Sequence, residues 1–94
     1  MVNIRILDHV ERASDYNDGQ VIFDLIKYDV IEGRPVSVSF DGISAVPSAF
    51  VNAAFIQLLE VAPVEQIRET LKIVDSTRFI NDLIRRRFEF SSGR

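Results

Sequence analysis

The sequence has no cysteine, and this absence excludes a disulfide framework and a thiolate zinc site. Its single histidine, His9, leaves little from which to build a metal centre or a nucleophile with a histidine base. Neither a glycine-rich phosphate loop nor a G-x-S-x-G motif occurs among the four glycines. We therefore expect a protein that is not an enzyme and that holds no metal, nucleotide or other cofactor.

A long apolar run is also missing. The first residues, MVNIRILDHVER, contain neither a signal peptide's apolar segment nor a membrane span, so we expect a soluble, cytoplasmic protein without membrane contact. The formal net charge of −3 gives no general attraction to nucleic acid, which would need a local basic patch. Ninety-four residues with 47% hydrophobic content suffice for one small core, and we expect a single domain over residues 1–94.

Period-two alternation of apolar and polar residues predicts strands over residues 2–7 and about 36–40, and the sequence LKIV supplies a third strand from Leu71. Residues 8–16 alternate weakly and leave open a short fourth strand at an edge. Helical segments separate the strands, which indicates an α/β fold with a three- to four-stranded, parallel or mixed sheet. So short a chain is expected to pack its helices mainly on one face of the sheet.

Apolar residues at i, i+4 and i+8 predict a helix over residues 19–31, which Asp18 caps and Gly33 ends. A second helical pattern covers residues 48–60, and a last helix begins near Arg78. The polar residues able to cap this last helix are Asp75, Ser76 and Thr77.

The helix predicted over residues 48–60 has two different faces. Its apolar half, which we expect to be buried, contains Phe50, Val51, Ala54, Phe55, Leu58 and Leu59. The other half is too apolar for an ordinary solvated surface and too small and polar for a core. We expect this half to receive a protein partner through Ala49, Asn52, Ala53 and Ile56.

The segment VSVSFDGISAVPSAFVNAAFIQLLE, followed by the strand LKIVDS, resembles the STAS-like family of small bacterial domains of unknown function. That family is related in fold to the STAS domains of anti-sigma factor antagonists. The resemblance, which covers most of the chain, implies a regulatory role in which the loop and following helix bind a partner with a histidine-kinase-like ATPase fold. It also implies that phosphorylation of a serine at the position of Ser48 breaks the complex. Pro47 stands where the related domains carry an acidic residue.

Ser48 has two interpretations. A serine at the entrance of a helix, here Ser48 or its neighbour Ser44, accepts a hydrogen bond from a free backbone N–H and contributes about 1 kcal/mol. A phosphate on the same hydroxyl would add nearly two negative charges beside the positive end of the helix dipole. We favour the cap because serines at helix starts are common, and we keep Ser48 as a candidate phosphoacceptor.

Arg85, Arg86 and Arg87 form the strongest run of like charge. Near the end of a helix such side chains complement its negative terminus. Interleaved with Phe88 and Phe90 they are also a candidate basic contact patch. The sequence therefore predicts a regulatory protein-binding domain. One alternative is a nucleic-acid-associated or defence-system subunit that uses these arginines, although the net charge of −3 disfavours nucleic-acid binding. Another is a structural homo-oligomer such as a homodimer.

Overall fold

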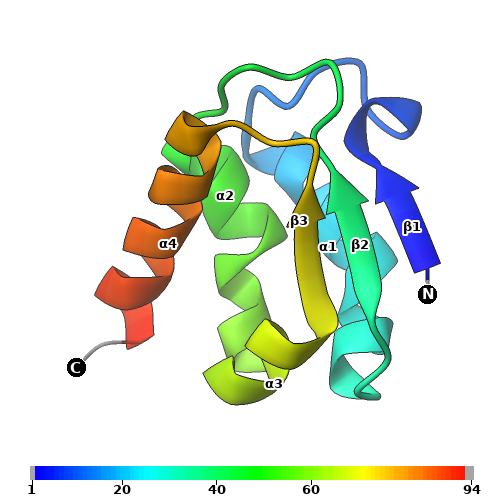
Figure 1. Cartoon of the computed structure of the whole chain (residues 1–94), viewed down its shortest axis with the longest axis vertical. Helices are drawn as coiled ribbons and strands as arrows, with labels where there is room; N and C mark the ends of the chain where they lie inside the picture. The colour runs from blue at the N-terminus through cyan, green and yellow to red at the C-terminus, as the bar shows by residue number, and fades with distance from the viewer. Residues whose placement is uncertain (1, 93–94) are drawn as a thin grey trace.

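The computed structural model describes residues 2–92, which alternate between strands and helices (Figure 1). The elements are β1 (Val2–Arg5), η1 (Ile6–Asp8), α1 (Tyr16–Ile31), β2 (Val36–Ser39), α2 (Ser48–Ala54), η2 (Ile56–Glu60), α3 (Val64–Thr70), β3 (Leu71–Val74) and α4 (Arg78–Ser92). Both η segments are short 3-10 helices. No helix within residues 2–92 combines the length and the apolar character that crossing a membrane requires.

The three strands form a parallel sheet in the order β1-β2-β3. In its register, Val36 of the central strand lies between Val2 and Leu71. A helical crossover connects each pair of neighbouring strands, which explains why the sheet is parallel and not mixed. The possible fourth strand over residues 8–16 is not formed, because the chain leaves β1 in a 3-10 turn and continues as a loop until α1.

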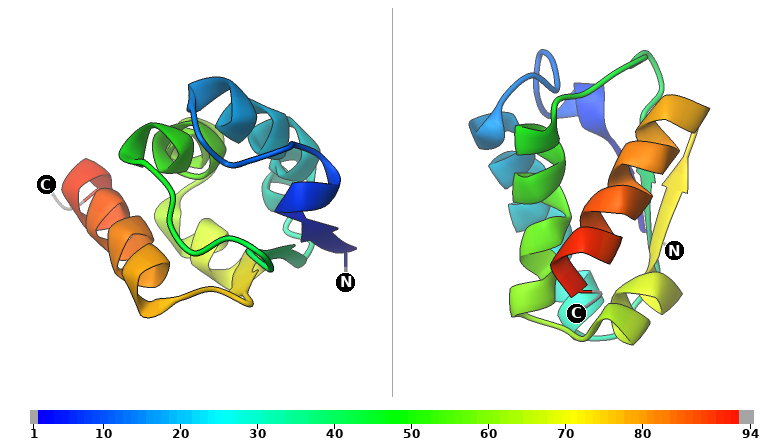
Figure 2. Two further views of the ribbon diagram at one scale, coloured as in Figure 1. Left: turned by 90° about the horizontal axis from the view of Figure 1, so that it is seen from above. Right: turned by 90° about the vertical axis from the view of Figure 1, so that its left-hand side faces the viewer.

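One face of the sheet is covered by α1 and α2, which lie together on the same side of the strands (Figure 2). Val36 and Val38 point to this side and are fully buried. On the opposite face Asn3 and Lys72 are exposed. The polar residues that alternate along the strands therefore face away from these two helices.

Three aromatic rings form the centre of the core. Phe40 follows β2, Phe50 lies in α2 and Phe55 lies directly after α2, and all three side chains are fully buried. Their ring centroids lie 6.1 to 6.4 Å apart, and Phe50 meets both other rings edge to face. Edge-to-face contacts of this kind stabilise the fold beyond the burial of apolar area alone. The inward side of α2 is therefore held against the end of β2.

The helix ends follow local capping rules with one change. The cap of α1 is Asp15 and not Asp18, since the Asp18 N–H donates to Asp15 Oδ1 at 2.9 Å. Gly33 ends α1 as predicted, with a φ of 77° and with the Arg34 N–H bonded to the Asp29 carbonyl at 2.8 Å. Of the three residues predicted to cap α4, Thr77 does so, and its hydroxyl accepts from the Ile80 N–H at 3.1 Å.

The helices α1 and α2 come unusually close at Gly19. A Cβ atom added to Gly19 would lie 2.5 Å from the Phe50 carbonyl oxygen and 2.7 Å from the Ala53 Cβ. Gly19 is buried and Ala53 is fully buried. Glycine is therefore required here by the approach of another backbone and not by a turn.

Replacing Gly19 with Ala is expected to destabilise the domain, although alanine is normally favoured within a helix by up to about 1 kcal/mol. The added methyl group must push α2 away, and overpacking of this kind costs about 1 to 3 kcal/mol. Chemical denaturation followed by circular dichroism measures the change. As a control, Asn17→Ala, at an exposed position in the same helix, should change stability by less than about 0.5 kcal/mol; equal stabilities for both variants would contradict the close packing.

Candidate functional site

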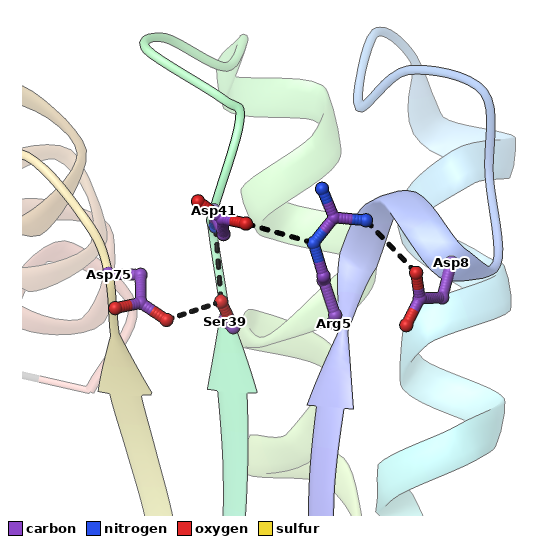
Figure 3. A network of polar contacts seen from close by, with 5 residues as sticks. All are labelled: Arg5, Asp8, Ser39, Asp41 and Asp75. Atoms are coloured by element: carbon purple, nitrogen blue, oxygen red, sulfur yellow. Dashed lines mark hydrogen bonds and ion pairs between the residues drawn. The ribbon is translucent and has the colours of Figure 1, made fainter.

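Polar side chains connect the carboxyl ends of the three strands (Figure 3). Arg5, at the end of β1, donates from Nε to Asp41 Oδ2 at 3.1 Å and from Nη1 to Asp8 Oδ1 at 2.9 Å. Ser39, at the end of β2, donates to Asp75 Oδ2 at 2.7 Å and accepts from the Asp41 N–H at 3.1 Å. These contacts link the turns that follow β1, β2 and β3.

The network is exposed, and its effect is mainly to orient the loops. The side chains of Arg5, Asp8 and Asp41 are 41%, 60% and 64% exposed to solvent. These ion pairs therefore contribute little to the free energy of folding. Hydrogen bonds to Asp41 and then to Asp8 raise the pKa of Arg5 above its usual value. Arg5 therefore stays charged at every physiological pH.

Two residues with positive φ turn the chain at this edge of the sheet. Gly42 has a φ of 87° and lies within the turn that the Ile43 N–H closes by donating to the Phe40 carbonyl at 2.8 Å. Asp75 has a φ of 54°, which is unusual for a residue with a side chain, and its carboxylate accepts the Ser39 hydroxyl bond. The polar network thus stabilises a backbone conformation at Asp75 that costs energy by itself.

A shallow hollow of about 400 Å³ lies beside the network, between the loop before α1 and the loop before α2. Its lining includes Leu7, Arg12, Gly42, Ser44 and Pro47. In parallel α/β sheets the crevice at the carboxyl ends of the strands is the usual position of a binding site. The loop between β2 and α2 therefore lies where such a sheet normally contacts ligands or partners.

Ser48 lies next to this hollow, at the first helical position of α2, and its side chain is exposed. Pro47 occupies the cap position, and no side chain accepts a hydrogen bond from the first turn of α2. Within residues 2–92 neither the Ser48 nor the Ser44 hydroxyl makes a hydrogen bond. The interpretation of either serine as the helix cap is therefore wrong, whereas phosphorylation of Ser48 stays a prediction.

The predicted partner-binding face of residues 48–60 is mostly occupied within the domain. Of the four predicted contact residues Ala49, Asn52, Ala53 and Ile56, only Ala49 is exposed. Ala53 is fully buried against α1, and Asn52 accepts a hydrogen bond from Arg87 Nε of α4 at 3.1 Å. Ile56 is half-buried against the core. The expectation of one exposed face is wrong because α1 covers one flank of α2 and α4 the other (Figure 2).

The three consecutive arginines do not form a common basic patch. Arg85 is bonded to Asp82 at 2.7 Å, which raises the pKa of this guanidinium. Arg87 turns toward α2 to reach Asn52, and its guanidinium lies 5.4 Å from the centre of the Phe90 ring. Arg86 is exposed. Neighbouring residues of a helix point about 100° apart, so the arginines offer phosphates no single basic surface.

One family model matches the chain, over residues 18–80, and it is described as a STAS-like domain of unknown function (DUF4325). The chain belongs to this family. The resemblance seen in the sequence is thereby confirmed, and the matched part runs from the first turn of α1 to the first turn of α4. Searches of curated proteins and of solved structures found no match.

The polar network of this STAS-like domain was not predicted from its sequence. A signal exists, because each strand is followed within a few residues by an aspartate: Asp8, Asp41 and Asp75. Carboxyl ends of parallel strands meet at one edge, which would have brought these residues together. Even so, among residues 2–92 no three His, Cys, Asp or Glu side chains are grouped closely enough to hold a metal ion.

The corrected role of Ser48 leads to a stability prediction. Ser48→Ala should leave the free energy of unfolding of the STAS-like domain unchanged within about 0.5 kcal/mol, because the hydroxyl is exposed and caps nothing. Thr77→Ala is the matched comparison and should cost about 1 kcal/mol, since Thr77 does cap α4. Urea denaturation of both variants checks the difference, and a loss for Ser48→Ala equal to that for Thr77→Ala would restore the cap interpretation.

Proposed function

We propose that this STAS-like domain is a non-enzymatic regulatory module that binds a protein partner through the loop before α2 and the first turn of that helix. The observation that carries the proposal is a run of exposed residues there: Ser44, Ala45, Pro47, Ser48 and Ala49. We call these five residues the carboxyl-edge surface. It is uncharged, and it adjoins the hollow between the two loops.

The ordering of the loop supports this proposal. The Arg5–Asp41 and Ser39–Asp75 contacts connect the end of β2 to both neighbouring strand ends (Figure 3). A surface that is ordered before binding loses less conformational entropy in a complex. Small, uncharged side chains also cost little to desolvate, so the carboxyl-edge surface suits contact with another protein.

Several features argue against an enzymatic role for Ser48. A serine nucleophile needs a base within hydrogen-bond distance. Within residues 2–92 the Ser48 hydroxyl has no such partner, and the only histidine, His9, is exposed. We therefore assign Ser48 to the binding surface and not to catalysis.

The family relationship suggests the partner's type. STAS domains of anti-sigma factor antagonists bind proteins with a histidine-kinase-like ATPase fold, and we propose a partner of this type for the present domain. Phosphorylation of Ser48 would add nearly two negative charges next to Ala49, in the middle of the proposed contact. A docked partner would have to remove water from this charge, so phosphorylation of Ser48 would release the partner.

The test uses an ATPase-fold protein encoded in the same genome and isothermal titration calorimetry. Ala49→Glu should weaken binding at least about tenfold, which is the loss expected when an unpaired charge enters an interface core. The fold should remain intact, since an acidic residue suits the first turn of a helix. Asn17→Glu is the matched control, because Asn17 is exposed at the equivalent second position of α1. Equal binding by both variants would contradict the proposal.

The proposed switch is tested separately, by incubating the two proteins with ATP and measuring the intact mass of the domain. One added phosphate that Ser48→Ala removes, together with loss of the complex, supports a switch. Complex formation that ATP does not change, without added phosphate, would leave a static adaptor that uses the same surface.

A second candidate function, a structural homo-oligomer, is favoured by α1. Val21, Leu25 and Tyr28 follow each other at i, i+4 and i+7 and are 41%, 40% and 63% exposed. If this row is a self-association surface, light scattering should show a mass that rises with concentration, and Leu25→Glu should return it to that of a monomer. A monomeric mass at low and high concentration would exclude this candidate.

A further inference from the structure

We propose that the free edge of β3, with the groove beside it, binds an extended acidic and apolar segment of another protein as an added strand. This site lies on a different part of the molecule from the carboxyl-edge surface. It combines an apolar floor, unpaired backbone groups and a basic rim, and each of these features is a separate observation.

The groove has a volume of about 380 Å³ and lies between α3, β3 and the second half of α4. Its apolar lining consists of Val64, Ile67, Leu71, Ile73, Ile84 and Phe88. In the central strand Val36 and Val38 are fully buried, whereas Leu71 and Ile73 at the same levels of β3 are only partly buried. The inner side of β3 therefore still has apolar surface to cover.

The register identifies which backbone groups of β3 are free. The Val74 carbonyl accepts the Phe40 N–H at 3.0 Å, so Val74 directs its backbone groups toward β2. Because successive residues of a strand point their N–H and C=O groups to opposite sides, those of Ile73 point to the outer edge. β3 ends the sheet among residues 2–92, and no other strand pairs with this edge.

The path of α4 leaves this edge accessible. In the right-hand view of Figure 2, α4 begins above the end of β3 and then slants away from the strand toward α2. The contact between Arg87 and Asn52 holds the second half of α4 against α2. An extended chain can therefore lie along β3 and insert alternate side chains into the groove, as in β-strand addition.

Charge identifies the occupant. Arg68 and Arg85 line the groove and Lys72 is exposed on the outer side of β3, against a single lining carboxylate, Glu89. Arg85 is already bonded to Asp82, whereas Arg68 makes no ion pair within residues 2–92. In a segment that alternates apolar with acidic residues, the apolar side chains would enter the groove and the acidic ones would lie on the side of Lys72. The positive charges of Arg68 and Arg85 at the groove favour a negatively charged segment as a whole.

A second copy of this chain fits less well. If two β3 strands paired antiparallel with Leu71 of one copy opposite Ile73 of the other, the Leu71 N–H would have to leave the Ile67 carbonyl, to which it is bonded at the end of α3. The two Lys72 side chains would then lie directly opposite each other, and like charges in that position are destabilising. We therefore assign the site to a different, acidic protein segment.

The probe is a capped hexapeptide that alternates glutamate and valine, titrated into the full chain and followed by NMR. The amide resonances of Leu71 to Val74 and of the second half of α4 should shift, and hydrogen exchange at Ile73 should slow. The same peptide with every internal amide N-methylated lacks the donors of a strand and should bind at least about tenfold more weakly. A peptide that alternates lysine and valine should also bind more weakly.

Two charge reversals test the rim. Arg68→Glu should weaken the acidic peptide about fivefold, since exposed ion pairs are worth up to about 1 kcal/mol each. Arg86→Glu, at an exposed position of α4 outside the groove, makes the same charge change and should leave the affinity within about twofold. Ala49→Glu should also leave the affinity for the acidic peptide unchanged. A negative result at the β3 groove can therefore be distinguished from a negative result at the carboxyl-edge surface.

Three results would overturn the proposal. In the first, the acidic peptide causes no shifts along β3 and α4. In the second, it binds as tightly to Arg68→Glu or after N-methylation. In the third, Ile73 exchange is already slow without peptide and slows further as protein concentration rises, which would show that a second copy occupies the edge.

Discussion

The close contact of α1 with α2 at Gly19 determines which surfaces of this domain remain available. Because no Cβ atom separates the helices there, α1 approaches the backbone of α2 and buries Ala53 completely. On its inner side α2 is held by Phe50, which packs against Phe40 at the end of β2. With α4 on its other flank, α2 is enclosed on three sides, and only its first turn is left for a partner.

The loop before α2 is ordered by electrostatics and hydrogen bonds more than by burial. Ser39 and Arg5 extend from the ends of two strands and bind the aspartates that follow β2 and β3. Their exposure makes the contacts weak contributors to stability, but they hold the turn at Asp41 and the strained backbone at Asp75. The carboxyl-edge surface, which lies within the residues 18–80 that the STAS-like family model matches, therefore follows a preformed turn.

The small size of the sheet has a second consequence. With only three strands, β3 is an edge strand whose inner side is partly covered by α3 and α4. Native proteins protect such edges by charged residues or by a covering helix or loop, and here Lys72 provides a charge on the outer side. The carboxyl-edge surface is neutral whereas the β3 groove has a basic rim, so the two proposed sites would select segments of different chemistry.

The sequence by itself determined what depends on residues close to one another in the chain. Period-two alternation identified β2, and helical periodicity identified α1 and α4. Local capping rules gave the role of Gly33 and left Thr77 as one of three candidate caps of α4. The family was also identifiable from the sequence, and the family model matches residues 18–80. Neither periodicity nor spacing distinguishes Asp15 from Asp18 as the cap of α1, since each aspartate could cap a helix that begins at the residue after it.

Only the tertiary structure decided which side of each helix is available. A helical wheel places Ala53 and Asn52 on the less apolar side of α2, but α1 and α4 arrive there from distant parts of the chain and cover both residues. Likewise, adjacency in sequence suggested a common patch for Arg85, Arg86 and Arg87, whereas helix geometry and separate partners divide them. The burial of a side chain depends on everything that packs around it, and for this domain most of that packing comes from residues far away in sequence.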